Sequence, residues 1–292
     1  MDTCEKRAYA KINLGLDVLG VLPNGYHQVK MIMQTVGIYD QLTFTRRQDQ
    51  RILITTDAGE LPTGPDNLIY RAIRLLQENT GVSYGVDIYL QKNIPIAAGM
   101  AGGSADAAAA MKGYNELYDL GVSRERMQKL GVKIGADVPY CVVGGTALAE
   151  GIGEKLTILP PAPRSILVVV KPDQNISTKE VYCSLDRCRQ MKHPDIDGMI
   201  AAMEAGDHTG MVQRLGNVLE PVTVEQCPVI LQIEEKMKEL GALGCMMSGS
   251  GPTVFGFYAT REEAEKALEA ILQKEELCIK QGYVTTFQQN ID

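Results

Sequence analysis

The chain has 292 residues, of which 45% are apolar and 22% are charged. These proportions are those of a soluble globular protein that is long enough for one large or two ordinary domains. The net charge of −7 disfavours nucleic acid or an anionic membrane as a partner. No apolar run approaches the ~20 residues of a membrane span, and residues 1–7 are too polar for a signal peptide.

The cysteines and histidines show no pattern of a disulfide framework or a metal site. Seven cysteines are scattered along the chain without a Cys-x-x-Cys pair, which predicts reduced thiols in a cytoplasmic protein. The three histidines lie far apart and lack zinc spacing. We therefore expect no metal held by protein ligands alone. Mg²⁺ delivered with a nucleotide stays open, because it needs few protein carboxylates.

The first half of the chain mixes strand and helix signals. Apolar residues with period two predict strands, and apolar residues at helical spacing predict helices. The strands are expected over residues 8–16, 41–45, 51–56, 84–90 and 142–149. The helices are expected over residues 66–81, 106–120 and 123–133.

The proline-rich segment 160–163 is the clearest linker signal. It predicts an N-terminal domain over residues 1–159 and a C-terminal domain over residues 164–292. The second part is helix-rich, with a helix over 229–241 and a capping box at Thr260–Glu263 that opens another. Its strands are expected over 165–170, 253–258 and 283–287. The whole pattern predicts an α+β protein.

Residues 95–110 combine a glycine-rich loop with the start of an alanine-rich helix. Gly99, Gly102 and Gly103 allow positive φ angles and close approach of a ligand, and a helix N-terminus adds unpaired N–H groups. Such a loop favours binding of a nucleotide phosphate. It has neither the Walker A pattern nor the dinucleotide fingerprint. Alternatively, the small residues serve only tight helix-on-sheet packing, with Ser104 as an ordinary N-cap.

Two further segments offer charged side chains for catalysis. Residues 8–16 alternate, so that Lys11 and Asn13 share one strand face. Asp137 lies in a turn bounded by glycine and proline. The functional interpretation is a carboxylate that accepts a hydroxyl proton during group transfer, oriented and kept ionised by Lys11. The structural alternative is a half-exposed strand and an aspartate that caps a helix or turn.

Two turns complete the set of candidate binding segments. Ser248–Gly251 supplies N–H and hydroxyl donors before a strand, as a second phosphate-facing loop or merely a tight turn. Tyr26 and His27 follow a Pro-x-Gly turn, which suits stacking on and hydrogen bonding to a flat ring.

Taken together, these segments resemble the GHMP kinase superfamily, which includes galactokinase, homoserine kinase and mevalonate kinase. The pairing of Ala-Lys-Ile-Asn-Leu with Asn-Gly-Tyr-His is similar to that of the members that act on 4-diphosphocytidyl-2-C-methyl-D-erythritol. The similarity runs nearly end to end, over residues 10–14, 24–27, 66–69, 95–110, 135–139, 145–149 and 247–255.

The resemblance implies a two-domain GHMP kinase fold with the active site in the interdomain cleft. It also implies ATP-dependent phosphorylation of the C2 hydroxyl of that substrate, in the non-mevalonate route to isopentenyl diphosphate. ATP would be the phosphoryl donor and would bring Mg²⁺ with it. The partners would be small molecules only, and the protein would be a monomer or weak homodimer in the cytoplasm.

The resemblance further implies roles for single residues. Asp137 would be the catalytic base, and Lys11 would hold it ionised and stabilise the transferring charge. The ATP-binding positions would be Asn67, Leu68, Lys92, Pro95, Ile96, Ala97, Ala98, Gly99, Met100, Ala101, Gly102, Gly103, Ser104 and Ala105. The substrate-binding positions would be Asn13, Tyr26, His27, Thr178, Tyr182, Ser248, Gly249, Ser250 and Gly251, with Tyr26, His27 and Tyr182 around the cytosine.

The departures from the family pattern are small. They are Tyr9 in place of the usual proline, Met100 in place of leucine, Ala105 in place of serine, and Met33 where some members have an aromatic residue. The alternatives are another small-molecule kinase of the superfamily, or a nucleotide-binding sensor without catalytic activity. The Tyr26–His27 pair argues against the first, and the retention of Lys11 and Asp137 argues against the second.

Overall fold

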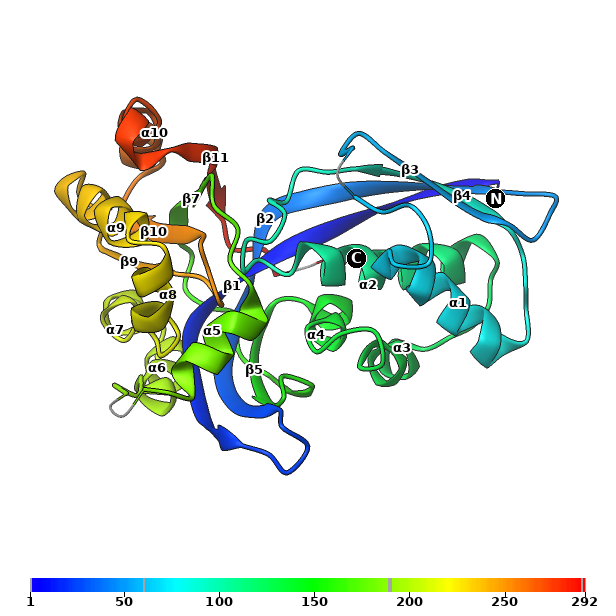
Figure 1. The fold of residues 1–292 in the computed structure, drawn as a ribbon, viewed down its shortest axis with the longest axis horizontal. Helices are drawn as coiled ribbons and strands as arrows, with labels where there is room; N and C mark the ends of the chain where they lie inside the picture. Colours follow the sequence, from blue (N-terminus) through cyan, green and yellow to red (C-terminus); the bar gives the residue numbers. More distant parts are fainter. Residues whose placement is uncertain (1, 60, 189–190, 290, 292) are drawn as a thin grey trace.

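The computed structural model describes residues 2–59, 61–188, 191–289 and 291, which form two lobes, each built on a β-sheet (Figure 1). The larger sheet has seven described strands: five follow the order β3-β4-β2-β1-β8, while β5 pairs with β2 and β6 pairs with β5. The smaller sheet has four described strands, all antiparallel, in the order β11-β7-β10-β9. The predicted α+β class is confirmed.

The larger sheet consists of β1 (Thr3–Val21), β2 (His27–Arg46), β3 (Ile52–Thr56), β4 (Val86–Gln91), β5 (Thr146–Gly151), β6 (Lys155–Ile158) and β8 (Gly216–Asn217). The smaller sheet consists of β7 (Ile166–Pro172), β9 (Gly244–Met247), β10 (Val254–Tyr258) and β11 (Ile279–Thr286).

Strands β1 and β2 form a long antiparallel hairpin that extends from the first lobe to the region between the lobes (Figure 1). The hairpin is much longer than the expected strands 8–16 and 41–45. Its pairing is irregular between Tyr9 and Lys11 and again between Asn13 and Gly15. Bulges of this kind re-aim side chains and release backbone groups from the ladder. The two bulges therefore lie directly before Lys11 and directly after Asn13, the polar residues that the sequence indicates as candidates.

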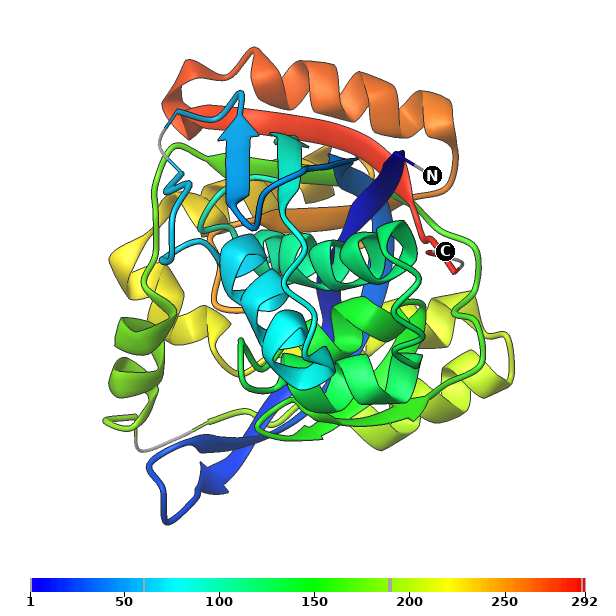
Figure 2. The same ribbon diagram turned by 90° about the vertical axis from the view of Figure 1, so that its right-hand side faces the viewer.

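Helices α1 (Leu68–Thr80), α2 (Gly102–Leu117), α3 (Arg124–Gly131) and α4 (Val138–Val143) lie on one side of the larger sheet (Figures 1 and 2). Helix α1 begins after Asn67, whose side chain accepts a hydrogen bond from the Ile69 N–H, and ends at Gly81 in the left-handed conformation. The expected helix over 66–81 is thus confirmed, and Gly81 ends it as the sequence predicts.

The second lobe contains the remaining helices. Helices α9 (Val229–Glu239) and α10 (Arg261–Leu272) pack on the smaller sheet, and Thr260 and Glu263 form the predicted capping box. The others are α5 (Thr178–Leu185), α6 (Ile196–Glu204), α7 (His208–Gln213), α8 (Glu220–Gln226) and the 3₁₀ turn Glu275–Leu277.

Two expected boundaries in the first lobe are wrong. The expected strand 142–149 starts too early, because helix α4 runs to Val143 and two glycines with φ near +70° turn the chain before β5. The helix expected from residue 106 begins at Gly102, with Ala101 at the N-cap and no side-chain cap. Ser104 therefore lies inside the first turn and is not an N-cap.

The chain crosses between lobes after the proline-rich segment. Strand β8 joins the larger sheet in parallel with β1, placing Gly216 opposite Gly15 and Asn217 opposite Leu16. The domain boundary at residues 160–163 remains a prediction. All seven cysteines are unpaired thiols, as expected. In the described part of the chain, no helix combines the length and apolar character needed to cross a membrane.

Glu234 in α9 is a buried carboxyl group that makes stability depend on pH. One of its oxygens has no hydrogen-bond partner among the described residues. Burial, followed by the charge of Glu220, raises the pKa of Glu234 from 4.5 to about 8. Between these two values the folded protein holds a proton that the unfolded chain has released, so the free energy of unfolding must fall as pH rises.

We therefore expect Glu234→Gln to flatten this fall. Urea unfolding at several values between pH 5 and pH 8 should show stability declining less in the variant than in the unmodified protein. Glu235→Gln, at an exposed neighbouring position on the same helix, is the matched control and should keep the original slope. Identical slopes for the Glu234 variant and the unmodified protein would contradict the assignment.

Candidate active site

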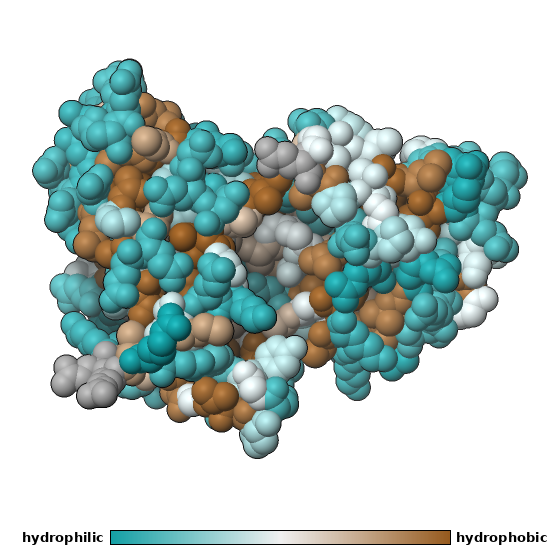
Figure 3. Space-filling model, viewed as in Figure 1, coloured by the Kyte–Doolittle hydropathy of each residue, from teal (hydrophilic) through white to brown (hydrophobic). Residues whose placement is uncertain are grey.

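A cavity of about 950 Å³ lies between the two lobes. The space-filling view shows the surface hollowed at this place (Figure 3). Its wall combines β1, the glycine loop, the starts of α2 and α4, helix α5 and the Gly249–Gly251 turn. All predicted site residues line it except Met100, Ala105 and Ser248, whose side chains are buried. The tertiary structure thus brings segments from both halves of the chain to one space.

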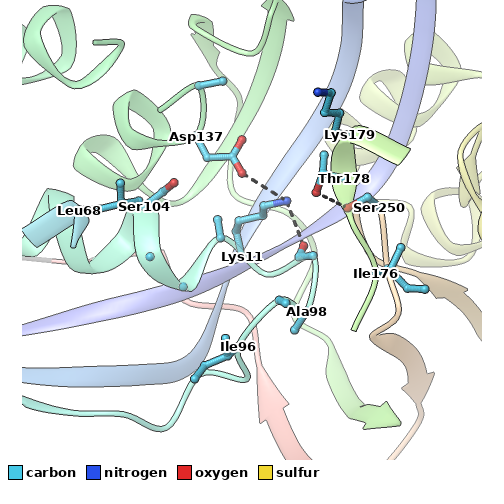
Figure 4. Close-up of a pocket in the computed structure, with 18 of the residues that line it drawn as sticks. Lys11, Leu68, Ile96, Ala98, Ser104, Asp137, Ile176, Thr178, Lys179 and Ser250 are labelled. Carbon is cyan, nitrogen blue, oxygen red and sulfur yellow. Dashed lines mark hydrogen bonds and ion pairs between the residues drawn. The ribbon is translucent and has the colours of Figure 1, made fainter. Parts of the chain in front are cut away.

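Lys11 and Asp137 meet at the centre of the cavity (Figure 4). The Lys11 Nζ lies 3.9 Å from Asp137 Oδ2. It also donates hydrogen bonds to Asn13 Oδ1 at 2.7 Å and to the Gly99 carbonyl at 3.1 Å. The bulge at Lys11 leaves its backbone N–H to donate to the Met100 carbonyl at 3.2 Å. Strand β1 is therefore fastened to the glycine loop through this one residue.

The structure differs from the purely structural interpretation of Lys11 and Asp137, in which one lies on a half-exposed strand and the other caps a helix. Lys11 and Asn13 are 5% and 0% exposed, so they are not polar residues on a half-exposed strand face. Asp137 occupies the N-cap position of α4, but its side chain makes no capping hydrogen bond. Because its carboxylate is partly exposed to the cavity and unused by the helix, it is available to accept a proton from a bound molecule.

The first turn of α2 faces the cavity with free donors. The backbone N–H groups of Gly102, Gly103 and Ser104 have no acceptor within the described residues, and neither has the Ser104 hydroxyl. The first intrahelical bond comes from the Ala105 N–H to the Ala101 carbonyl. Free N–H groups at the positive end of a helix dipole bind anions. The first turn of α2 therefore offers donors that suit an anion such as a phosphate group.

The glycine loop is in direct contact with the Ser248–Gly251 turn. A Cβ on Gly99, whose φ is +71°, would lie 2.2 Å from the Ser248 carbonyl oxygen, so only glycine fits there. Ser248 Oγ donates to the Gly99 carbonyl at 3.1 Å. Ser250 Oγ lies 2.8 Å from Thr178 Oγ1, which links the turn to α5. The turn thus supports the glycine loop and connects both lobes across the cavity.

Lys92 is held by two carboxylates. Its ammonium pairs with Asp40 and, at 3.1 Å, with Asp106 Oδ2 in the first part of α2. Burial alone would lower the pKa of Lys92, but the charges of Asp106 and Asp40 raise it. Burial raises the pKa of Asp106 well above its ordinary value. Lys92 lines the cavity, and its charge is paired with these two carboxyl groups. Its expected place beside the adenosine stays a prediction.

An aromatic cluster occupies another part of the cavity wall. The rings of His27 and Tyr182 pack in a tilted arrangement with centroids 4.6 Å apart and an interplanar angle of 39°, and Tyr26 is 59% exposed at the adjoining turn. Burial, followed by the charge of Asp137, raises the pKa of the Tyr182 hydroxyl. Tyr182 is therefore uncharged at neutral pH and lies within electrostatic reach of Asp137. The predicted contacts of Tyr26, His27 and Tyr182 with a flat ring remain a prediction.

Sequence reasoning missed three residues that shape the site. Asp186 Oδ1 lies 2.7 Å from His27 Nε2 and so orients that ring. Asn217 Nδ2 donates to the Met247 and Gly249 carbonyls, which sets the Ser248–Gly251 turn. Lys179 lines the cavity beside Thr178. No local pattern marks Asp186 or Asn217, because their partners lie far away in sequence.

The carboxylates, histidines and cysteines of the described chain form no cluster of three or more that would hold a metal ion. In the first turn of α2, the Ser104 hydroxyl has no partner among the described residues and is an oxygen of the kind that Mg²⁺ accepts as a ligand. The residues present therefore fit a cation that arrives bound to a nucleotide and keeps most of its water.

Comparisons with known proteins agree with this geometry. The chain matches the GHMP kinases N terminal domain over residues 67–145 and the GHMP kinases C terminal domain over residues 199–276. It is 50% identical over 285 residues to a protein of Lachnospira eligens named 4-diphosphocytidyl-2-C-methyl-D-erythritol kinase, and the match covers 98% of each chain.

Solved structures show the same fold. A crystal structure of 4-(cytidine 5'-diphospho)-2C-methyl-D-erythritol kinase matches 98% of this chain and 100% of that one, with a TM-score of 0.82 and 29% identity. Homoserine kinase from Cytophaga hutchinsonii shares the fold with a TM-score of 0.77 and 21% identity, over 99% of this chain and 96% of that one. With a shared two-domain fold and 50% identity to a curated relative over nearly its whole length, the chain belongs to the GHMP kinase family.

Proposed function

We propose that this protein transfers the γ-phosphoryl group of ATP to the C2 hydroxyl of 4-diphosphocytidyl-2-C-methyl-D-erythritol. The single observation that carries the chemistry is the Lys11–Asp137 pair, 3.9 Å apart, in the cavity that the first turn of α2 also lines. The packed rings of His27 and Tyr182 offer that same cavity an aromatic surface for a base. The substrate class follows the family relationship.

The proposed step is an in-line displacement. The C2 oxygen forms a bond to the γ-phosphorus while the bond from that phosphorus to the β,γ-bridging oxygen breaks, so ADP leaves with the bond's electron pair. Asp137 accepts the proton that the hydroxyl loses. Lys11 keeps Asp137 charged and stabilises the negative charge on the transferring group. The hydroxyl is tertiary and hindered, so positioning matters more than nucleophile strength.

The ATP phosphates would lie on the N–H groups of Gly102, Gly103 and Ser104. Mg²⁺ delivered with ATP neutralises charge on the phosphates, and the Ser104 hydroxyl is the residue that would meet it. Asn67 and Leu68 would border the adenosine, although both polar groups of the Asn67 side chain are engaged by Ile69 and Pro62.

Three broader expectations belong to the same proposal. The lobes would divide at residues 160–163 into domains of residues 1–159 and 164–292. The protein would act as a monomer or weak homodimer on small molecules only. We place it in the cytoplasm, because seven unpaired thiols suit a reducing compartment.

A coupled ADP-release assay tests the function. Steady turnover is expected with 4-diphosphocytidyl-2-C-methyl-D-erythritol and none with mevalonate, homoserine or galactose. Turnover with one of these three instead would identify another small-molecule kinase of the family. ATP binding without ADP release on any acceptor would indicate a sensor without catalytic activity.

A further inference from the structure

Helix α5 presents one continuous face to the active-site cavity. Lys179, Tyr182, Cys183 and Asp186 all line the cavity, and they are spaced by three or four residues along the helix. Residues at this spacing share one side of a helix. Tyr182 and Asp186 contact His27, so the later part of this face belongs to the aromatic cluster. Lys179 lies one turn earlier, next to Thr178.

Lys179 is a cation without a partner in the described structure. Neither an ion pair nor a hydrogen bond engages its ammonium, whereas the other two cavity lysines, Lys11 and Lys92, are both paired with carboxylates. It is also the second residue of α5, where the positive end of the helix dipole disfavours a cation. Lys179 is exposed at the cavity wall, so its ammonium is hydrated and is available to pair with a bound anion.

The position of Lys179 along the cavity indicates which anion. Figure 4 shows Thr178 and Lys179 on one side of the Lys11–Asp137 pair and Ser104 on the other. Three residues, a rise of about 4.5 Å along the helix, separate Lys179 from Tyr182. A substrate with its base at Tyr182 and its reacting hydroxyl at Asp137 must span the intervening stretch of wall. In a cytidine diphosphate ester, the ribose, the diphosphate and the first carbons of the esterified alcohol occupy that stretch, and the diphosphate is its anionic part.

We propose that Lys179 binds the diphosphate of the acceptor substrate and thereby sets the preference for a nucleoside diphosphate ester. This inference rests on the proposed function. The ammonium neutralises charge on a group that does not react, so its contribution is to substrate binding and alignment. Thr178 is hydrogen-bonded to Ser250 and so holds the start of α5 against the Ser248–Gly251 turn. This contact fixes the backbone position from which the Lys179 side chain extends.

Calorimetric titration of cytidine and of CDP into the full-length protein separates the diphosphate contact from base recognition. Lys179→Met, which keeps a long apolar stem, should weaken CDP binding roughly tenfold and leave cytidine binding unchanged. Lys179→Arg should restore most of the CDP affinity. Lys133→Met, at an exposed position away from the cavity, is the matched control and should change neither. In turnover, Lys179→Met should raise the KM for the acceptor with little change in kcat.

The other outcomes are equally informative. Unchanged CDP affinity, or equal losses for CDP and cytidine, would overturn the assignment of Lys179 to the diphosphate. Loss of ATP affinity with CDP binding intact would assign the ammonium to the ATP phosphates and also overturn it. An unmodified protein that binds ATP but neither CDP nor cytidine would refute the proposed function itself, and this inference with it.

Discussion

Replacing Asp137 with asparagine is expected to lower kcat by roughly 10²–10⁴-fold, the usual contribution of a positioned general base. Asparagine keeps the shape of the side chain but removes the proton acceptor. The Asp137 side chain makes no capping bond to α4, so the replacement should leave the fold unchanged. ATP affinity should survive, because the predicted phosphate contacts come from the first turn of α2. Single-turnover kinetics with saturating ATP measures the effect on the chemical step.

The partner of Asp137 supplies the control for this result. Lys11→Met removes the charge that lies 3.9 Å from the carboxylate and should also lower kcat. If the two residues act as a unit, the double variant will be little slower than the slower single variant. Near-normal turnover of Asp137→Asn, with the thermal unfolding midpoint unchanged, would show that this carboxylate is not the base. Multiplicative losses in the double variant would show that the two side chains act independently.

Replacing Tyr182 with alanine is expected to weaken binding of the acceptor substrate much more than binding of ATP. Stacking of a base on an aromatic ring contributes on the order of 1–3 kcal/mol, which is about 5- to 150-fold in affinity. The variant also removes the ring that packs against His27 at 4.6 Å, so His27 loses part of its support. The KM values for the two substrates, measured separately at saturation of the other, report the difference.

Tyr182→Phe is the matched control, because it keeps the ring and removes only the hydroxyl. It should retain most of the affinity for the acceptor if stacking is what Tyr182 contributes. Equal losses of acceptor and ATP affinity in Tyr182→Ala would mean that the cytidine pocket lies elsewhere. A loss in Tyr182→Phe as large as in the alanine variant would assign the effect to the hydroxyl instead of the ring.

Local sequence patterns predicted a feature correctly where the residues that determine it lie within a single segment of the chain. The period-two alternation around Lys11 placed it on the same strand face as Asn13, and glycine spacing identified the loop that leads into α2. The capping box at Thr260 and the glycine after α1 marked helix ends correctly. These signals depend on neighbours within one turn or one strand, so they are readable without tertiary information.

Tertiary packing decided what those residues do. Lys92 was expected beside the adenosine, and tertiary contacts pair its charge with Asp40 and Asp106, which lie 52 and 14 residues away in the sequence. Asp186 orients His27 across 159 residues, and Ser248 meets the Gly99 carbonyl across 149. Strand β8 joins β1 although the proline-rich segment lies between them in the chain. Each of these contacts depends on which surfaces the folded lobes bring within a few ångströms, and no periodicity in the sequence encodes that proximity.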